Sequence, residues 1–193
     1  MSGLVLASGS ASRRAMLDAA GVPYRARPAQ VDERAVEAAL ADAVPAAVAL
    51  ALAEAKARDV HADHWTLGSD SLVAVEGRRF DKPASREQAG EHLAFFSGKV
   101  MHLHSAAAIV GPDGEEWRHA ALAELHVRDL SPRFIDTYLD AEWPAISQCA
   151  GAFRIEALGV QLFERIEGDH FTVLGMPLLP VLGALRQFGV IAS

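Results

Sequence analysis

The chain carries at residues 4–14 the stretch LVLASGSASRR, which sets the start of its fold. Residues 4–7 are apolar and typical of a short buried strand, and the Ser/Gly run after them predicts a tight loop. Residues 13–20 then place apolar side chains at helical spacing and stop at Gly21, a typical end of a helix. The chain therefore begins with a strand, a loop and a helix.

This opening has the outline of an anion-binding site. The hydroxyl groups of Ser8 and Ser10 and several backbone N–H groups lie at the expected N-terminus of the helix, which carries partial positive charge. Arg13 and Arg14 in the first turn are unfavourable to the helix dipole, and a bound anion would relieve that cost. A serine N-cap beside two solvated arginines explains the same residues, so both interpretations stand.

Hydrophobic periodicity predicts further strands and helices in a single domain spanning residues 1–193. We expect strands at residues 24–26, 65–75, 101–110, 115–127 and 160–166, and helices at residues 45–60 and 177–188. Two more helices are predicted to begin near Ser85 and Ser131. The polar run at residues 68–71 is expected to interrupt the second of these strands, and residues 77–79 are expected to form a turn.

Composition limits the classes of protein and partner. With 51% hydrophobic and 22% charged residues among 193, the chain is not disordered. Its formal net charge of −7 disfavours nucleic acid as a partner, because polyanions are bound through clustered Lys and Arg. The single cysteine, Cys149, fits a reducing cytoplasm. We expect no signal peptide and no membrane span, since the longest apolar run, residues 44–53, is well short of the roughly 20 residues that cross a bilayer.

Carboxylates at expected strand ends are candidates for a divalent metal site. Asp70 lies in the polar interruption between apolar residues, where a carboxylate is partly buried and needs a partner. Asp32 and Glu33 follow another apolar segment. Such carboxylates suit Mg²⁺, which takes one or two of them together with phosphate oxygens of a substrate. For Asp32 a turn-forming role is the better interpretation.

Two isolated lysines, Lys56 and Lys82, are candidate phosphate-binding cations. Lys56 lies in the Ala-rich helix, and Lys82 directly precedes Pro83. Because proline restricts the residue before it to an extended conformation, the direction of the Lys82 side chain is preset. A solvated surface charge is the competing interpretation for both lysines.

The histidines and the cysteine carry a weaker signal. His102 and His104 alternate in a predicted strand and share one face, as a zinc-binding pair would. No third ligand follows at a diagnostic spacing, so we interpret this pair as part of a solvated strand face. Cys149 is interpreted as a small buried residue.

Several of these features occur together in the order found in one family. Residues 6–14 resemble the opening signature of the Maf family of nucleoside triphosphate pyrophosphatases, a Leu-Ala-Ser-x-Ser-Pro run that ends in Arg-Arg, although Ala11 replaces the proline. The further matching motifs are Val31-Asp32-Glu33, Ala55-Lys56-Ala57, Gly68-Ser69-Asp70, Lys82-Pro83, Ser97-Gly98, Cys149-Ala150-Gly151, residues 163–169 and Gly175-Met176-Pro177-Leu178. The resemblance spans nearly the whole chain.

The resemblance implies an α/β fold whose mixed, twisted sheet forms two lobes around a central cleft, similar to inosine triphosphate pyrophosphatases. It implies hydrolysis of the α–β phosphoanhydride of a nucleoside triphosphate to a monophosphate and pyrophosphate. A divalent metal cation, Mg²⁺ or Mn²⁺, is the implied cofactor. A homodimer is the implied assembly.

The resemblance also assigns roles residue by residue. The phosphate-binding loop comprises Ser8, Ser10, Arg13 and Arg14. Glu33 and Asp70 form the metal-binding acidic pair, and Asp70 is the candidate general base, acting directly or through the metal. Lys56 and Lys82 are the cations that face the phosphates. A triphosphate bears about four negative charges, so a metal is needed to keep Glu33 and Asp70 from repelling it.

Substrate choice within the family is expected to depend on three positions, Ser12, Ser71 and Glu156. The branch that resembles dTTP/UTP pyrophosphatases has an Arg directly after the proline and a late Ile-Gln-Gly run, whereas this chain has Ser12 and Glu156 there, like the 7-methyl-GTP branch. A carboxylate at Glu156 can accept hydrogen bonds from guanine and favours a ring made cationic by N7 methylation, although a surface strand residue is the competing interpretation. Ser71 stands where that branch often has Gln.

Three functions therefore remain in view. The leading one is a pyrophosphatase that prefers 7-methyl-GTP or other modified nucleotides. The others are a dTTP/UTP pyrophosphatase and a nucleotide-binding regulator of septum formation with little turnover.

Overall fold

The computed structural model describes residues 3–192 and divides them into two compact units. Unit 1 comprises residues up to 71, residues 104–122 and residues from 169 onward, and unit 2 comprises residues 72–103 and 123–168. The prediction of a single domain stays a prediction. No helix among the described residues is long and apolar enough to cross a membrane.

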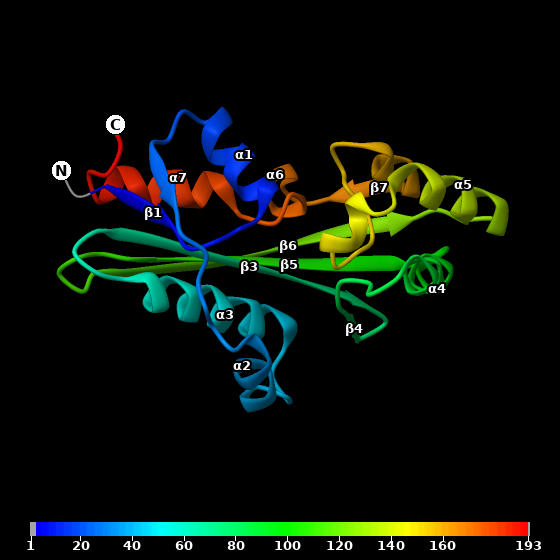
Figure 1. Ribbon diagram of the computed structural model, residues 1–193, viewed down its shortest axis with the longest axis horizontal. Helices are drawn as coiled ribbons and strands as arrows, with labels where there is room; N and C mark the ends of the chain where they lie inside the picture. Colours follow the sequence, from blue (N-terminus) through cyan, green and yellow to red (C-terminus); the bar gives the residue numbers. More distant parts are fainter. Residues whose placement is uncertain (1–2, 193) are drawn as a thin grey trace. The chain divides into compact units, whose positions relative to one another are not determined.

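Figure 1 shows the helices and strands in their order along the chain. Unit 1 holds β1 (Leu4–Leu6), α1 (Ala11–Ala19), β2 (Tyr24–Ala26), α2 (Glu33–Ala39), α3 (Pro45–Val60), α6 (His170–Val173) and α7 (Leu178–Gln187). Unit 2 holds β4 (Arg78–Phe80), α4 (Arg86–Phe96), α5 (Pro132–Glu142), the short 3₁₀ helices η1 (Ala145–Gln148) and η2 (Leu158–Leu162), and β7 (Phe163–Glu167). Residues of both units contribute to β3 (Trp65–Val75), β5 (Val100–Val110) and β6 (Glu116–Val127).

The strands form one seven-stranded sheet in the order β2-β1-β3-β5-β6-β7, with β4 paired to β3. Strand β1 pairs in parallel with both β2 and β3, whereas β3 with β4 and β6 with β7 are antiparallel. The predicted α/β class with a mixed sheet is confirmed.

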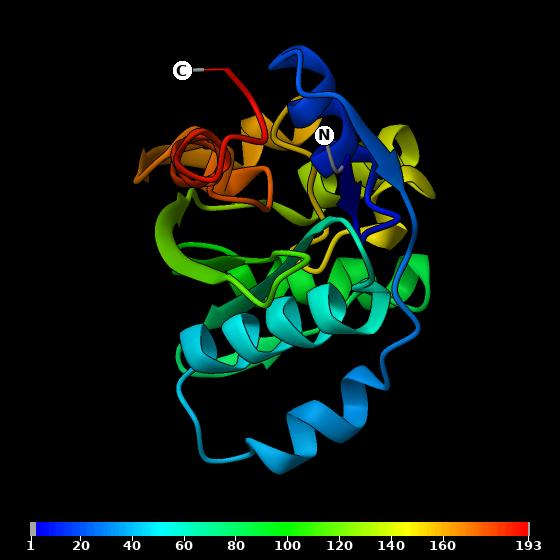
Figure 2. The ribbon, with the colours of Figure 1, turned by 90° about the vertical axis from the view of Figure 1, so that its left-hand side faces the viewer.

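Helices cover both faces of the strands in unit 1. Helices α1 and α7 lie on one face and α3 lies on the other (Figures 1 and 2). On the first face Leu6 and Leu67 pack with Leu17 of α1 and Leu185 of α7, and all four are fully buried. Burial of such a side chain contributes about 1.5–3 kcal/mol, so this layer is a main source of stability for the unit that holds the opening loop.

Local sequence signals explain where the helices begin. The hydroxyl of Ser10 accepts a hydrogen bond from the Arg13 N–H at the start of α1, which makes Ser10 an N-cap. Ser85 and Ser131 cap α4 and α5 in the same way, as predicted. Asp32 caps α2 by accepting from the Ala35 N–H, so its role is the local one that the sequence favours.

Strand β3 is continuous, and the predicted interruption at residues 68–71 is wrong. Gly68 is required by packing, because a β-carbon there would overlap the carbonyl oxygen of Ala53 and lie 2.6 Å from the amide nitrogen of Ala57, both in α3. The buried hydroxyl of Ser69 donates to the carbonyl of Ala106, so the polar residue is satisfied within the sheet. The Gly-Ser pair therefore serves the close approach of a helix to a strand.

Two other expectations need correction, and two helices were not foreseen. Residues 78 and 79 belong to β4, and the turn before it is made by Glu76 and Gly77, both with positive φ, as a tight hairpin between twisted strands requires. The predicted strand at residues 160–166 begins only at Phe163, after η2. Helices α2 and α6 were not predicted, because each is too short to show a helical period.

Substituting Gly68 tests the helix–strand contact. We expect Gly68→Ala to lower the free energy of unfolding by about 3 kcal/mol or more, because the new methyl group meets helix backbone, which cannot rotate away. Chemical denaturation measures the change. Gly183→Ala is the matched control, since Gly183 is exposed in α7 with open space around it and should gain about 0.5–1 kcal/mol. A Gly68→Ala variant as stable as the original chain would contradict the packing.

Candidate functional site

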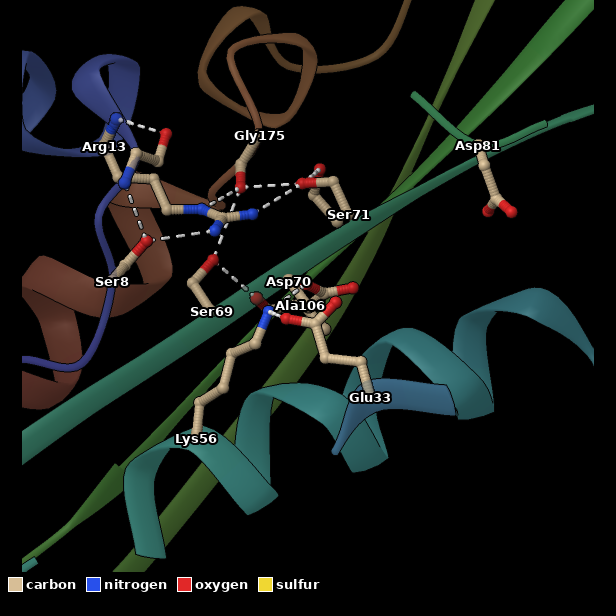
Figure 3. A network of polar contacts seen from close by, with 12 residues as sticks. Ser8, Arg13, Glu33, Lys56, Ser69, Asp70, Ser71, Asp81, Ala106 and Gly175 are labelled. Carbon is tan, nitrogen blue, oxygen red and sulfur yellow. Dashed lines mark hydrogen bonds and ion pairs between the residues drawn. The ribbon is translucent and has the colours of Figure 1, made fainter. Parts of the chain in front are cut away.

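Arg13 joins three distant segments of unit 1 (Figure 3). Its buried guanidinium donates from Nε to the Gly175 carbonyl at 2.9 Å, from Nη1 to Ser8 Oγ at 3.2 Å and from Nη2 to Ser71 Oγ at 3.0 Å. The rigid fork of an arginine suits three acceptors arranged in this way. Arg13 therefore holds the opening loop against β3 and against the loop before α7.

The carbonyl of Gly175 is the common acceptor of this network. It receives hydrogen bonds from the hydroxyls of Ser71 at 2.9 Å and Ser69 at 3.3 Å, in addition to that from Arg13. Gly175 has φ +100°, and a β-carbon there would lie 3.0 Å from Ser71 Oγ, so only glycine fits. Ser105 completes the arrangement by donating to the Thr172 carbonyl at 2.8 Å, and its Oγ lies 3.2 Å from Ser71 Oγ.

The electrostatics of Arg13 favour an anionic neighbour. Burial lowers its pKa, and the negative charges of Asp70 and Glu33 act against that shift. All three groups to which it donates are uncharged, so its positive charge is not neutralised by a directly bonded carboxylate. A buried cation of this kind stabilises negative charge placed beside it.

Lys56 brings two carboxylates together (Figure 3). Its Nζ lies 2.5 Å from Asp70 Oδ1 and 2.8 Å from Glu33 Oε1. The three side chains come from α3, β3 and the first residue of α2. Only 12% of the Lys56 side chain and 11% of the Asp70 side chain are exposed, so a solvated surface charge is the wrong interpretation for Lys56.

The donor set of Glu33 and Asp70 fits a divalent cation. Both carboxylates converge on one positive charge, and hard oxygen ligands are those that Mg²⁺ and Mn²⁺ prefer. Half of the Glu33 side chain is exposed, which leaves solvent access for the water molecules that Mg²⁺ retains. The two residues would hold the metal, with Lys56 beside it.

The remaining predicted residues of unit 1 lie on or near α1. Ser8 is buried, Ser10 caps the helix, Ser12 is half-buried, and Arg14 is exposed in the first turn. Ser71 takes part in the Arg13 network described above. In unit 1 the structure thus gathers Ser8, Arg13 and Ser71 in one network, and Glu33, Lys56 and Asp70 in a second.

Lys82 and Glu156 belong to unit 2 and are exposed. Both act on Cys149, which is half-buried, not buried as predicted. Burial raises the pKa of the Cys149 thiol, the charge of Glu156 raises it further, and the charges of Arg154 and Lys82 oppose the shift. Lys82 and Glu156 therefore act in opposite directions on the pKa of the same thiol, that of Cys149.

Sequence reasoning missed the ion pair that anchors the segment before Glu156. Glu142 is 4% exposed, and its Oε2 accepts from both Nε and Nη2 of Arg154 at 2.9 Å. Nearby, Tyr138 donates to the Ala152 carbonyl at 3.0 Å, and burial raises the pKa of this tyrosine. Glu142 lies in the last turn of α5, 12 residues before Arg154, and no sequence pattern at that separation indicates that the two form a pair.

Sequence comparisons with known proteins agree in one family. The sequence model of the family described as "Maf-like protein" matches residues 3–188. The chain is 47% identical to a "7-methyl-GTP pyrophosphatase" of Rhizobium meliloti, over 97% of each chain. It is 44% identical over both full lengths to "Nucleoside triphosphate pyrophosphatase 1" of Jannaschia sp.. Among solved structures, the Ham1 protein of Staphylococcus aureus aligns with TM-score 0.39 and 15% identity, over 66% of this chain and 72% of that one.

Replacing Arg13 tests the three-way network. We expect Arg13→Lys to lower the free energy of unfolding by about 1.5–3 kcal/mol, because an ammonium cannot reach all three acceptors and leaves buried oxygens without donors. Urea denaturation measures this loss. Arg14→Lys is the control, and its exposed position predicts a change within about 0.5 kcal/mol. Equal effects of the two substitutions would show that Arg13 does not connect the loops.

Proposed function

Because the chain belongs to the Maf-like protein family, we propose that it hydrolyses the α–β phosphoanhydride of nucleoside triphosphates at the Lys56 cluster, with 7-methyl-GTP as its preferred substrate. The cluster of Glu33, Lys56 and Asp70 is the observation that carries the location of the chemistry. Nucleoside triphosphate pyrophosphatase activity itself is what the named relatives share.

Asp70 is proposed as the general base. Its carboxylate takes a proton from a water molecule while the oxygen of that water bonds to phosphorus and the bridging P–O bond breaks. The products are a nucleoside monophosphate and pyrophosphate. The ammonium of Lys56, at 2.5 Å, holds the Asp70 carboxylate in one orientation.

Several groups are proposed to supply positive charge or hydrogen bonds to the triphosphate. Arg13 supplies a buried charge beside the opening loop, and Ser8 and Ser10 supply hydroxyls at the N-terminus of α1. Arg14 and Lys82 are proposed to face the phosphates. A divalent cation, when bound by Glu33 and Asp70, supplies the charge needed to offset the roughly four negative charges of a triphosphate.

Glu156 is proposed to select the base. Its side chain is exposed, and a carboxylate can accept hydrogen bonds from the N1–H and 2-amino group of guanine while attracting a ring that N7 methylation makes cationic. Ser71 contributes indirectly, since its hydroxyl is engaged with Arg13 and Gly175. Several relatives at 44–47% identity are named 7-methyl-GTP pyrophosphatase, which favours this branch over a dTTP/UTP enzyme.

Removing the base should abolish turnover. We expect Asp70→Asn to lower kcat for pyrophosphate release by about 10²-fold or more with Mg²⁺ or Mn²⁺, because an amide cannot take the proton. Asp63→Asn is the matched control, since the Asp63 side chain is fully exposed next to His64. Thermal denaturation of both variants separates lost chemistry from lost folding. A folded Asp70→Asn variant with full activity would show that Asp70 is not the base.

A panel of nucleotides tests the substrate. We expect 7-methyl-GTP to give a higher kcat/KM than GTP, dTTP or UTP, and Glu156→Gln to reduce this preference over GTP by about tenfold, equal to about 1.4 kcal/mol. Preference for dTTP or UTP would favour the other branch. Tight binding without pyrophosphate release would favour a regulatory role, and release of orthophosphate would indicate a different hydrolase.

A further inference from the structure

A second group of metal-ligand side chains lies in unit 2, on strands β6 and β7. The antiparallel register pairs Glu124 with Glu167 and His126 with Arg165. Since alternate residues of a strand share a face, these four side chains lie on one face of the strand pair. The ligand atoms of Glu124, His126 and Glu167 all lie within 4.8 Å of one another.

The distances suit a small tetrahedral cation. The Nε2 atom of His126 lies 3.3 Å from Oε1 of Glu167. Two ligands bound to zinc at roughly 2.0–2.1 Å in tetrahedral geometry are also separated by roughly 3.3 Å. One imidazole nitrogen and two carboxylates form a ligand set that zinc accepts with a water molecule in its fourth position.

The position between His126 and Glu167 already attracts a cation. The guanidinium of Arg165 places Nη1 2.8 Å from Glu167 Oε1 and Nη2 3.1 Å from His126 Nε2. The same Nη2 lies 3.5 Å from His126 Nδ1, so the guanidinium lies against the face of the imidazole while it pairs with Glu167. The Arg165 side chain is 61% exposed and can turn into solvent.

The third ligand is held by a neighbouring strand. The Nε2 atom of His102 on β5 lies 3.6 Å from Oε1 of Glu124. His102 lies outside the group of three ligands, and it contacts that group through Glu124. Spacing along the chain gave no sign of the group, because Glu124 and Glu167 are paired only by strand register.

We propose that Glu124, His126 and Glu167 bind one zinc ion in place of the Arg165 guanidinium. This site lies wholly in unit 2, whereas Glu33 and Asp70 lie in unit 1, so it does not depend on the proposed function. Strand β7 stands at the end of the sheet and has only β6 as its neighbour in the strand order. The ion therefore cross-links an edge strand to the sheet and stabilises the folded chain by mass action.

Zinc titration of chelator-stripped protein tests this proposal. Competition with a chromophoric chelator in the Asp70→Asn background, which lacks the other candidate metal pair, should give one zinc ion per chain. In that background His126→Ala and Glu167→Gln should each weaken binding at least tenfold. Arg165→Ala should bind zinc more tightly than the original chain, since the competing cation is gone. Bound Co²⁺ in place of zinc should show the intense visible absorption of a tetrahedral site, and this should disappear in His126→Ala.

Two controls distinguish zinc bound at this site from zinc bound elsewhere on the surface and from zinc bound by Glu33 and Asp70. His119→Ala, on the same strand β6, should leave zinc affinity unchanged, and Asp70→Asn should keep the zinc ion that His126→Ala loses. Zinc should also raise the midpoint of thermal unfolding in the original chain but not in His126→Ala. Weaker binding by Arg165→Ala, equal loss with His119→Ala, or loss only with Asp70→Asn would each overturn the proposal.

Discussion

The arrangement of unit 1 depends on how closely α3 approaches β3. Gly68 has no side chain to separate them, and Ala53 and Ala57 present only methyl groups, so helix and strand backbones meet directly. Lys56, one residue before Ala57, and Asp70, two residues after Gly68, are thereby brought to 2.5 Å. A larger residue at position 68 would separate the ion pair as well as weaken the packing.

The charged side chains of the two networks in unit 1 balance one another without a ligand. Arg13 and Lys56 contribute two positive charges, and Glu33 and Asp70 contribute two negative ones that act on Arg13. A triphosphate would add about four negative charges, far more than these side chains offset. This is the physical reason for proposing a divalent cation at Glu33 and Asp70, and for proposing Arg14 and Lys82 as further partners of the phosphates.

Local signals allowed much of the fold to be predicted from the sequence, whereas long-range contacts did not show in it. The bounds of β2, α3 and β3 follow from apolar runs and proline, and Ser10, Ser85 and Ser131 cap helices as expected. Gly68 was misinterpreted as a break because its reason lies in α3. The carbonyl partner of Arg13 is 162 residues away, and Lys56 meets Glu33 and Asp70 only through packing. The order of the motifs identified these residues as candidates, but only the structure shows the contacts among them.

Lys56 and Asp70 are central to this account, because they are proposed to act as one unit in the reaction. A double-mutant cycle in kcat/KM for pyrophosphate release, with Lys56→Met, Asp70→Asn and the double variant, measures their coupling directly. The account predicts a large loss of kcat/KM in each single variant. It also predicts that the kcat/KM of the double variant is scarcely below that of the less active single variant. Losses that multiply in the double variant would contradict it, because the two residues would then act independently.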